Sequence, residues 1–239
     1  MIDFHSHILP SIDDGSNSIE ETVKLIKEAS KVGFTGIIST SHYIQGYYEL
    51  NCHERKELLD IIQNKIIRED YLNIQLYLGS EVYFSAEMLE LIKEKKASTI
   101  NNTRYILFEL PMNTKPLFVK EMVYTLIQNG YKPIIAHPER YSYVQDEINY
   151  VEELANIGAL FQSNYGSIIG MYGSNAKKTF KKLLKNNLIS FLGSDVHRVG
   201  QIYPQIPHIL KKLKRLISTQ QLEKLTTLNA QKVLKNEDL

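Results

Sequence analysis

Short apolar runs alternate with amphipathic stretches along the whole of this 239-residue chain. Seven short runs have the composition of buried strands, and they are Met1–Phe4, Thr35–Thr40, Ile74–Leu78, Tyr105–Leu110, Pro133–Ala136, Ala159–Gln162 and Leu188–Leu192. Eight stretches between and after them favour helices, and they are Ser18–Lys31, His53–Arg68, Ala86–Lys95, Lys115–Asn129, Glu147–Ile157, Ser174–Asn186, Pro207–Ile217 and Gln220–Lys235. In the first of these, Ser18 followed three positions later by Glu21 is the arrangement of a capping box.

This order of elements indicates a parallel sheet, because strands separated by helices are joined by right-handed crossovers. Seven such units predict an α/β protein with a distorted (β/α)7 barrel, one strand short of the eightfold TIM-like form. An open doubly wound sheet is the alternative, although no Gly-x-Gly-x-x-Gly motif follows the first run. The sequence has no long linker, low-complexity tract or repeat, so residues 1–239 are expected to form a single domain.

The composition narrows the class of partner and the compartment. A formal net charge of +1 gives no general attraction to nucleic acid or to acidic membranes. Cys52 is the only cysteine, which excludes an internal disulfide and fits a reducing compartment. No apolar run reaches the ~18 residues of a membrane span, and acidic and imidazole groups from Asp3 onward are unlike a signal peptide. We therefore expect a cytoplasmic protein that neither binds nucleic acid nor inserts into a membrane.

Side chains that bind metals cluster at the C-terminal ends of the expected strands, where the active sites of parallel barrels form. His5 and His7 alternate in the first strand, so both imidazoles point to one face and can chelate one ion. Six of the seven strands supply such a residue at or just after that end, and the candidate set is His5, His7, Asp14, His42, Glu81, Glu109, His137, Asp195 and His197. Each residue alone could be an ordinary turn or rim residue, but their joint placement favours a metal site.

The chemistry of these nine side chains favours a phosphate substrate. None is a thiolate, so the set suits manganese, iron, zinc or magnesium. Nine protein ligands are enough for three divalent ions that keep open positions for water and substrate. Three such ions carry six positive charges against the four carboxylates of the set, and the remaining two match the dianion of a phosphate monoester. Arg140 follows the fifth strand and offers a planar donor for phosphate oxygens.

Five segments together resemble the polymerase-and-histidinol-phosphatase (PHP) superfamily. They are the opening Asp-Phe-His-Ser-His-Ile-Leu-Pro-Ser-Ile-Asp-Asp-Gly, then Gly-Ser-Glu, Phe-Glu-Leu-Pro, His-Pro-Glu-Arg-Tyr and Gly-Ser-Asp-Val-His. The opening combined with His-Pro-Glu-Arg-Tyr is most similar to the bacterial PHP-type protein-tyrosine phosphatases of capsule and exopolysaccharide operons. The resemblance extends from residue 1 to about residue 235.

This resemblance implies a distorted (β/α)7 PHP barrel, a trinuclear site in which manganese is favoured, and hydrolysis of phosphotyrosine on a partner tyrosine kinase. The ligand groups that it implies are His5, His7 and Asp195 for a first ion, Glu109 and His137 with a bridging Glu81 or Glu109 for a second, and Asp14, His42 and His197 for a third. The residues that it places in catalysis are Arg140, His42 and Asp14.

One segment departs from the pattern of that family. The resemblance predicts Thr-Pro-His-His at the end of the second strand, whereas this chain has Thr-Ser-His-Tyr, with Ser41 and Tyr43 at the changed positions. The ligand position, His42, is retained. The change therefore concerns the shape of the loop and the substrate rim rather than the metal core.

The implied reaction is in-line attack on phosphorus by a hydroxide that two metal ions activate, with tyrosinate as the leaving group. A cysteine-based phosphatase is disfavoured, because Leu58 stands six positions after Cys52, where that chemistry needs an arginine. A small-molecule phosphomonoesterase such as a histidinol-phosphate phosphatase is the alternative function. A metal-dependent exonuclease and a non-catalytic metal-bound scaffold follow it. The metal used in the cell, the partner kinase and any homo-oligomer stay open from sequence alone.

Two further groups of residues have both a functional and an ordinary interpretation. Aromatic side chains near the strand ends could sandwich a phenyl ring or belong to the surface and core, and they are Tyr43, Tyr47, Tyr48, Tyr83, Phe84 and Tyr165. Basic side chains near the C-terminus could attract an acidic partner but fit a solvated face better, and they are Lys211, Lys212, Lys214 and Arg215. Five further lysines are expected to form a solvated helix face, and they are Lys177, Lys178, Lys181, Lys182 and Lys185.

Overall fold

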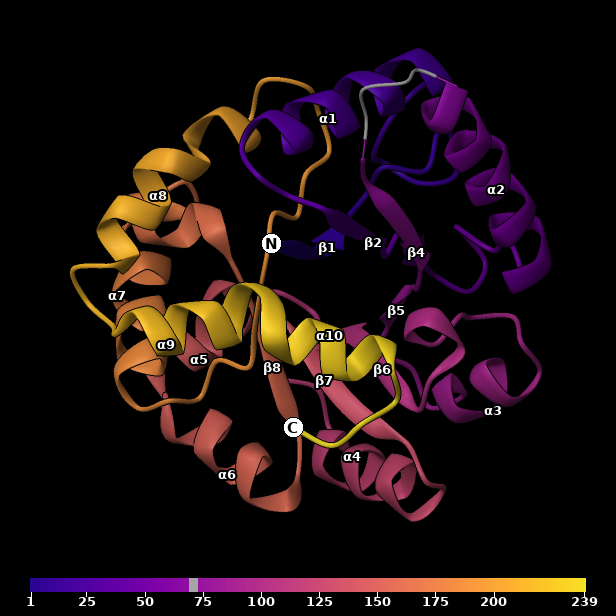
Figure 1. Cartoon of the computed structure of the whole chain (residues 1–239). Coiled ribbons are helices and arrows are strands. Elements are labelled where there is room, and N and C mark those ends of the chain that lie inside the picture. Colours follow the sequence, from indigo (N-terminus) through magenta and orange to yellow (C-terminus); the bar gives the residue numbers. More distant parts are fainter. Residues whose placement is uncertain (69–72) are drawn as a thin grey trace.

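The strands form a curled, parallel arrangement that helices surround (Figure 1). The computed structural model describes residues 1–68 and 73–239. Its strands are β1 (Ile2–Ser6), β2 (Gly36–Ser39), β3 (His42–Tyr43), β4 (Gln75–Leu78), β5 (Glu81–Tyr83), β6 (Tyr105–Glu109), β7 (Lys132–Ala136), β8 (Leu160–Asn164) and β9 (Phe191–Gly193). Three of them pair in the order β1-β2-β4, and six pair in the order β3-β5-β6-β7-β8-β9.

Backbone connections join the two sheets into a distorted barrel. β3 continues β2 after a two-residue break, and β5 continues β4 in the same way. At the other edge, Asp195 N donates to His5 O at 2.8 Å and His7 N donates to Val196 O at 3.0 Å, which ties the end of β9 to β1. With each broken strand counted once, the described residues form a barrel of seven strands. The predicted (β/α)7 TIM-like barrel is therefore confirmed over the open-sheet alternative.

The helices follow in the predicted order. They are α1 (Ile19–Lys31), α2 (Cys52–Arg68), α3 (Met88–Lys93), α4 (Val119–Gln128), α5 (Ser142–Asp146), α6 (Asn149–Ile157), α7 (Gly173–Lys185), α8 (Ile206–Leu213), α9 (Thr219–Glu223) and α10 (Asn229–Leu234). Ser18 caps α1, because its hydroxyl accepts a hydrogen bond from Glu21 N at 3.2 Å. The second half of the capping box differs from the prediction, since Glu21 Oε2 accepts from Asn17 N at 2.8 Å.

Two helical stretches differ from their predicted extents. The stretch predicted from Lys115 is helical only from Val119, because Phe118 has a left-handed backbone with a φ of 62°. Pro116 also disfavours a helical conformation of the residue before it. The C-terminal stretch contains a π-helical segment at Lys224–Leu228, which separates α9 from α10. The pattern predicts no helix at α5, which is only five residues long.

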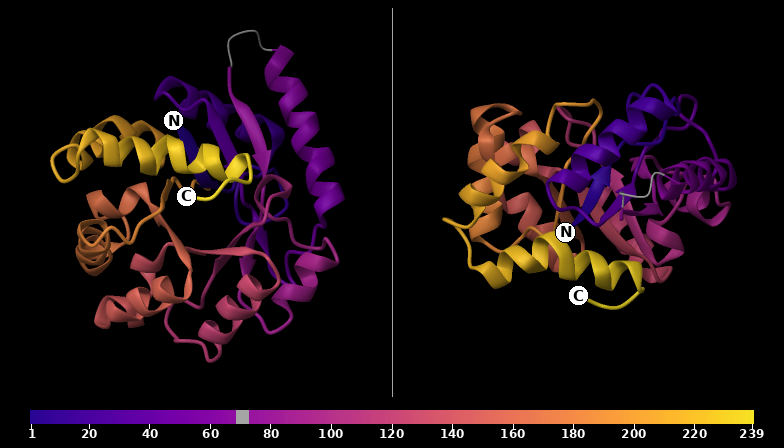
Figure 2. Two further views of the ribbon diagram at one scale, coloured as in Figure 1. Left: turned by 60° about the horizontal axis from the view of Figure 1, so that its bottom comes forward. Right: turned by 45° about the horizontal axis from the view of Figure 1, so that its top comes forward.

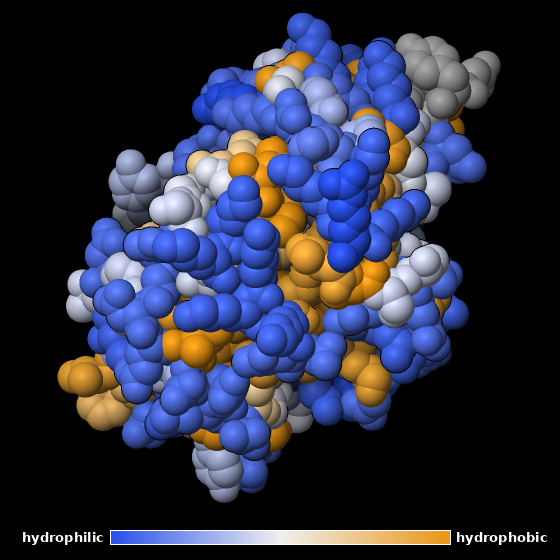
Figure 3. Space-filling view, turned by 90° about the vertical axis from the view of Figure 1, so that its left-hand side faces the viewer, coloured by the Kyte–Doolittle hydropathy of each residue, from blue (hydrophilic) through white to orange (hydrophobic). Residues whose placement is uncertain are grey.

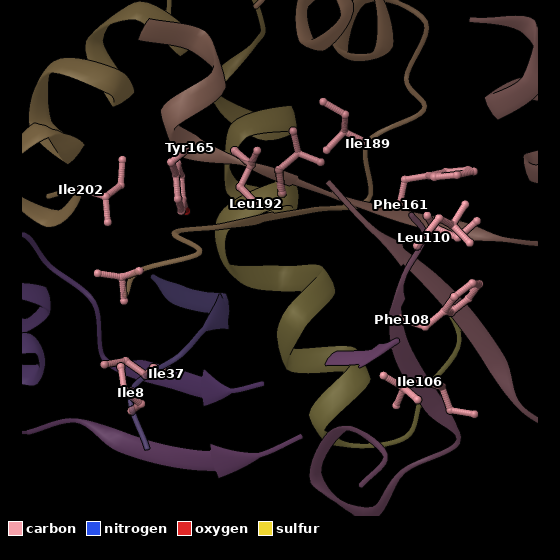
Figure 4. Packing of buried hydrophobic residues seen from close by; sticks show 14 of the residues in the cluster. Ile8, Ile37, Ile106, Phe108, Leu110, Phe161, Tyr165, Ile189, Leu192 and Ile202 are labelled. Atoms are coloured by element: carbon pink, nitrogen blue, oxygen red, sulfur yellow. The ribbon is translucent and has the colours of Figure 1, made fainter. Parts of the chain in front are cut away.

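Apolar side chains fill both the barrel and the layer between the barrel and its helices. Figure 4 shows part of the outer layer, to which β2, β6, β8 and β9 contribute. Inside the barrel, the rings of Phe4 and Phe191 stack with their centroids 3.9 Å apart. Ala230 and Val233 of α10 belong to this inner cluster, so the C-terminal helix covers the N-terminal ends of the strands (Figure 2). The polar candidate residues lie at the opposite, C-terminal ends.

The side of the molecule with α7 and α8 is mainly hydrophilic, and apolar residues show between the hydrophilic rows (Figure 3). Lys178, Lys181, Lys182 and Lys185 of α7 are exposed, as expected for a solvated helix face. No helix in the described part of the chain is long and apolar enough to cross a membrane.

Candidate metal centre

The ends of β1 and β5 bring together a first group of candidate ligands. His5 and His7 lie side by side, with their Nε2 atoms 3.0 Å apart. Glu81 Oε2 lies 3.2 Å from His5 Nε2 and 3.3 Å from His7 Nε2. Asp195 Oδ1 approaches the same two nitrogens at 3.6 and 3.4 Å. Two imidazoles and two carboxylates therefore converge on one point at the C-terminal edge of the barrel.

A second group surrounds the other side of Glu81. His42 Nδ1 lies 3.0 Å from Glu109 Oε1 and 3.2 Å from Glu81 Oε2. His137 Nε2 lies 2.8 Å from Glu81 Oε1 and 3.9 Å from Glu109 Oε2. Of the two glutamates left open as the bridge, Glu81 is thus the one whose oxygens face both groups.

The third group consists of His7, Asp14, His42 and His197, and their donor atoms lie within 4.8 Å of one another. Asp14 Oδ1 is 3.3 Å from His197 Nε2 and 3.6 Å from His42 Nε2. The Asp14 side chain is 56% exposed, whereas the Glu81 side chain is fully buried. This third group is therefore the part of the cluster that opens to solvent.

Arg140 stands at the edge of the cluster with its side chain 27% exposed. Its Nη1 donates to Asp195 Oδ2 at 2.7 Å, and Asn164 Nδ2 donates to the same oxygen at 2.7 Å. Tyr172 packs against the guanidinium, with 4.6 Å between Arg140 Cζ and the ring centroid. A guanidinium has five N–H donors, so Arg140 keeps donors for a bound anion.

The polar atoms of the cluster fit divalent cations. His42 Nδ1 is buried and has no hydrogen-bond partner in the described structure, although two carboxylate oxygens lie within 3.2 Å of it. The Nε2 atoms of His5 and His7 face each other, and one proton can satisfy only one of the two as a donor. A cation between such atoms would satisfy all of them. Imidazole and carboxylate donors without a thiolate suit manganese, iron, zinc or magnesium.

Burial and charge oppose each other throughout the cluster. Burial disfavours the charged form of His7, but nearby carboxylates, Asp13 foremost, outweigh it and raise the pKa of His7 well above its ordinary value. Burial likewise disfavours the ionised form of Glu81, but the surrounding imidazoles hold its pKa well below its ordinary value. The site is thus arranged around buried carboxylate charge that positive partners stabilise.

Two residues outside the predicted set hold candidate ligands in place. The side chain of Asp13 is buried, and its Oδ2 accepts from His7 Nδ1 at 2.8 Å and from His42 N at 2.8 Å. Gln162 Oε1 lies 2.8 Å from His5 Nδ1. Partners of this kind fix the ring orientation of metal-binding histidines.

These two residues differ in how far the sequence could have revealed them. Asp13 stands beside Asp14 in the opening motif, and only the fold shows which carboxylate turns inward. Gln162 and Asn164 end β8, the strand that supplies no His, Asp or Glu to the predicted set. A search of strand ends that included amide side chains would have found Gln162 and Asn164.

Close packing and unusual backbone conformations occur where the ligands meet. His137 and Asp195 have left-handed backbones, with φ values of 31° and 54°. Such conformations cost on the order of 1–3 kcal/mol and concentrate at functional sites. A Cβ added to Gly193 would lie 2.5 Å from His5 Cβ, so β9 approaches β1 this closely only because position 193 is glycine.

The two histidines that are not in the candidate set, and Cys52, lie outside the three groups. His53 is 83% exposed and pairs with Glu57, and His208 is exposed on α8. Cys52 begins α2 and accepts a hydrogen bond from Ser98 Oγ at 3.1 Å. Cys52 therefore has a local packing role in this structure.

The aromatic residues near the strand ends divide into two sets. Tyr43 and Tyr165 are buried, with 2% and 0% of their surface exposed, so the interpretation as core residues is correct for both. Tyr47 is exposed, and Tyr48, Tyr83 and Phe84 are half-buried. Only this second set can contact a substrate.

Comparison with known proteins gives consistent matches along nearly the whole chain. A family model described as capsular polysaccharide synthesis, CpsB/CapC, matches residues 1–235. The chain is 36% identical over 214 residues to the putative tyrosine-protein phosphatase CapC of Staphylococcus aureus, which covers 89% of this chain and 82% of that protein. It is 32% identical over 241 residues to the tyrosine-protein phosphatase CpsB of Streptococcus agalactiae, covering 99% of each.

The fold is also similar to a solved structure. That structure is described among crystal structures of YwqE from Bacillus subtilis and CpsB from Streptococcus pneumoniae, "unique metal-dependent tyrosine phosphatases". The TM-score is 0.91 at 30% sequence identity, and the match covers 100% of this chain and 96% of the other. The likeness therefore includes the strand ends that carry the candidate ligands.

Proposed function

Because this chain belongs to the CpsB/CapC family of capsular polysaccharide synthesis, we propose that it is a metal-dependent tyrosine-protein phosphatase, a hydrolase of the phosphoric monoester of phosphotyrosine. The observation that carries this proposal is the convergence of imidazoles and carboxylates at one edge of the barrel beside the partly exposed Arg140. The relatives named as tyrosine-protein phosphatases match this chain over most of its length, which supports the same activity here.

We further propose that the site holds three divalent ions, with manganese favoured. Three groups of donors support this number, and they are His5, His7 and Asp195 with Glu81, then His42, Glu109 and His137 with Glu81, and finally His7, Asp14, His42 and His197. When bound, such ions lower the pKa of a coordinated water to near neutrality and supply a nucleophile for the phosphorus atom.

The residues of the chain would position the phosphoryl group and the ligands. Arg140 is partly exposed beside the cluster and can donate to two phosphoryl oxygens at once. Asp195 and Tyr172 fix the position of its guanidinium. Asp14 belongs to the group that opens to solvent, so we place the entry of the substrate there. The buried side of the cluster excludes water, which strengthens each charge interaction.

The proposed substrate is a phosphotyrosine-containing protein, in particular a bacterial tyrosine kinase that acts in capsule or exopolysaccharide synthesis. The family description supports this context. We also keep the cytoplasmic location as part of this proposal, because the free thiol of Cys52 fits a reducing compartment.

A substrate panel tests the proposal. The manganese-loaded protein is expected to hydrolyse a phosphotyrosyl peptide with a higher kcat/KM than histidinol phosphate or a phosphoseryl peptide. A chelator should abolish this activity, and added manganese should restore it. The His7→Ala variant should lose turnover, whereas the matched variant His53→Ala, at an exposed histidine outside the site, should retain it.

Two results would contradict the proposal in different ways. Preferred hydrolysis of histidinol phosphate would indicate a small-molecule phosphomonoesterase. If the metal-loaded protein hydrolysed none of these esters, the barrel would be a binding scaffold instead.

A further inference from the structure

A short loop after β3 presents two adjacent tyrosines at the open side of the metal centre. The Tyr48 ring lies parallel to the His42 ring, with centroids 6.2 Å apart and planes inclined by 10°. The Tyr47 ring meets Tyr48 edge-on, with 4.6 Å between centroids and an angle of 76°. His42 in turn faces Asp14 in the solvent-exposed group of donors. The Tyr48 ring thus lies beside a member of that group, and the Tyr47 ring lies against Tyr48.

Tyr47 has no evident role in the stability of the fold. Its surface is 74% exposed, and among the described aromatic rings it pairs with that of Tyr48. No hydrogen bond between described residues involves either hydroxyl group. A ring with this exposure gains little free energy from burial, so the Tyr47 ring stays accessible to a bound molecule.

The backbone nevertheless holds this loop in one conformation. Ile44 N donates to Tyr48 O at 3.0 Å, and both Tyr47 N and Tyr48 N donate to Ile44 O. Gly46 lies between Ile44 and Tyr47 and has a φ of +79°, a conformation that the tight turn requires. The buried Arg55 donates to the carbonyl oxygen of Ser41, just before β3, and to that of Leu50, beyond the loop. The two rings therefore stand on a loop whose backbone is closed by hydrogen bonds.

We propose that Tyr47 and Tyr48 form a platform that binds the aromatic ring of the substrate while its phosphoryl group occupies the metal centre. This inference rests on the proposed function and names the residues that select an aryl ester. Aromatic rings attract one another in offset-stacked and edge-to-face arrangements, at about 0.5–1.5 kcal/mol per pair beyond area burial. An alkyl phosphate reaches the same metals but has no ring to place on the platform.

The changed residue at the end of the second strand, Tyr43, is not part of this platform. Tyr43 stands where the related pattern has a second histidine, and it is buried rather than part of the rim. Its ring lies 5.8 Å from the guanidinium carbon of Arg55. Tyr43 therefore supports the base of the loop, and its neighbours Tyr47 and Tyr48 face the substrate.

A matched pair of phosphonates tests the platform. Phenylphosphonate and methylphosphonate share the head group and differ in the aromatic ring, and neither is hydrolysed. The inhibition constants of both are measured for manganese-loaded protein with p-nitrophenyl phosphate as substrate, and binding is repeated by calorimetry. The wild-type protein should prefer phenylphosphonate. Tyr47→Ala and Tyr48→Ala should each reduce that preference about three- to tenfold, as the loss of one aromatic contact predicts.

Two further variants make the result interpretable. Tyr48→Phe keeps the ring and should keep the preference. Tyr124→Ala removes a tyrosine of α4 that is 58% exposed and should leave the preference unchanged. Because Tyr47 is mostly exposed, Tyr47→Ala tests the platform without a risk to folding, and the metal content of every variant is measured alongside.

The outcomes separate this inference from the proposed function. An unchanged preference in both alanine variants would overturn the platform. An equal loss of both phosphonates in Tyr48→Ala, together with lost metal, would show that Tyr48 only supports His42 and would overturn its assignment. If the ring preference depends on Tyr47 but phosphotyrosyl peptide is not hydrolysed, the platform stands and the proposed function fails.

Discussion

His7 occupies the middle of the candidate metal centre. Its Nε2 lies 3.3 Å from Glu81 Oε2 and 3.4 Å from Asp195 Oδ1, while its Nδ1 donates to Asp13 at 2.8 Å. Asp13 also accepts from the backbone of His42. One carboxylate thus sets the tautomer of one ligand and the position of another, so its loss should affect metal binding rather than a single hydrogen bond.

We expect Asp13→Asn to weaken metal binding about 10- to 100-fold, which is the usual effect of removing an outer partner of a metal-binding histidine. The neutral amide cannot supply the negative charge that stabilises the His7–metal unit. Affinity is measured by competition with a chelator of known strength. Asp60→Asn is the control, because Asp60 is an exposed partner of Lys56 on α2. Equal affinity in the Asp13 variant and in the wild-type protein would refute the positioning role.

Replacement of Cys52, unlike that of Asp13, should leave the site intact. We expect Cys52→Ser to retain near-normal kcat on p-nitrophenyl phosphate, because Cys52 lies at the start of α2 and outside every ligand group. The residue six positions later is Leu58 rather than an arginine. A large loss of turnover with normal metal content and folding would argue for a thiol-based reaction.

Most residues of the site could be predicted, because side chains that bind metals occur at the C-terminal ends of the expected strands. The spacing of His5 and His7 placed both imidazoles on one face, and their Nε2 atoms lie 3.0 Å apart. Their roles as ligands stay a prediction. The inward turn of Asp13 and the contacts of Gln162 depend on packing between distant parts of the chain. His5 and Gln162, for example, are 157 residues apart in the sequence. Periodicity carries no signal for such partners.

At the scale of elements, Arg55 joins α2 to the loop that carries His42. Its side chain is fully buried, and it donates to the carbonyl oxygens of Leu50, Ser41 and His42 at 2.5–2.7 Å. No carboxylate among the described residues forms a salt bridge with it, and burial lowers the pKa of Arg55 to about 10. Burying a guanidinium charge that only carbonyl oxygens stabilise costs free energy. This cost indicates that the geometry of the loop matters.

Replacing this residue should therefore damage both stability and the site. We expect Arg55→Met to lower the free energy of unfolding by about 2 kcal/mol or more, because buried carbonyl groups lose their donor. Denaturant unfolding measures the change. Lys56→Met is the matched control, since Lys56 is the exposed neighbour on the same helix and should alter stability by at most about 0.5 kcal/mol. Equal stability of the two variants would contradict this account.

Element types were predictable from periodicity, whereas their interruptions were not. The second and third apolar runs were expected as plain strands, yet each continues past a break into a second short strand, β3 or β5. Those breaks let His42 and Glu81 pair in a separate sheet, with His42 opposite Glu81. The late start of α4 follows from the left-handed Phe118. Local conformations of this kind are set by tertiary packing, which hydrophobic patterning does not encode.

At the scale of the whole molecule, the inner apolar cluster and the polar cluster lie at opposite ends of the barrel. The inner cluster around Phe4 and Phe191 is closed by Ala230 and Val233 of α10. The candidate ligands lie at the other ends of the same strands. The single domain predicted for residues 1–239 stays a prediction, as does the oligomeric state. This separation implies that the barrel can keep its fold when the polar end loses its cations.

Metal removal should consequently lower stability without unfolding the protein. A ligand at a concentration of about 100 times its Kd stabilises the native state by about 2.7 kcal/mol, and for a chain of this size each kcal/mol shifts Tm by about 2–4 °C. We therefore expect chelation to lower Tm by about 5–10 °C, while the far-ultraviolet circular dichroism at room temperature stays unchanged.

In His7→Ala the same treatment should shift Tm much less, because that variant has less metal to lose. If Tm were identical before and after chelation of a metal-loaded wild-type protein, the ions would not be held by this buried cluster. Collapse of the secondary structure on chelation would instead mean that the two ends of the barrel are not independent.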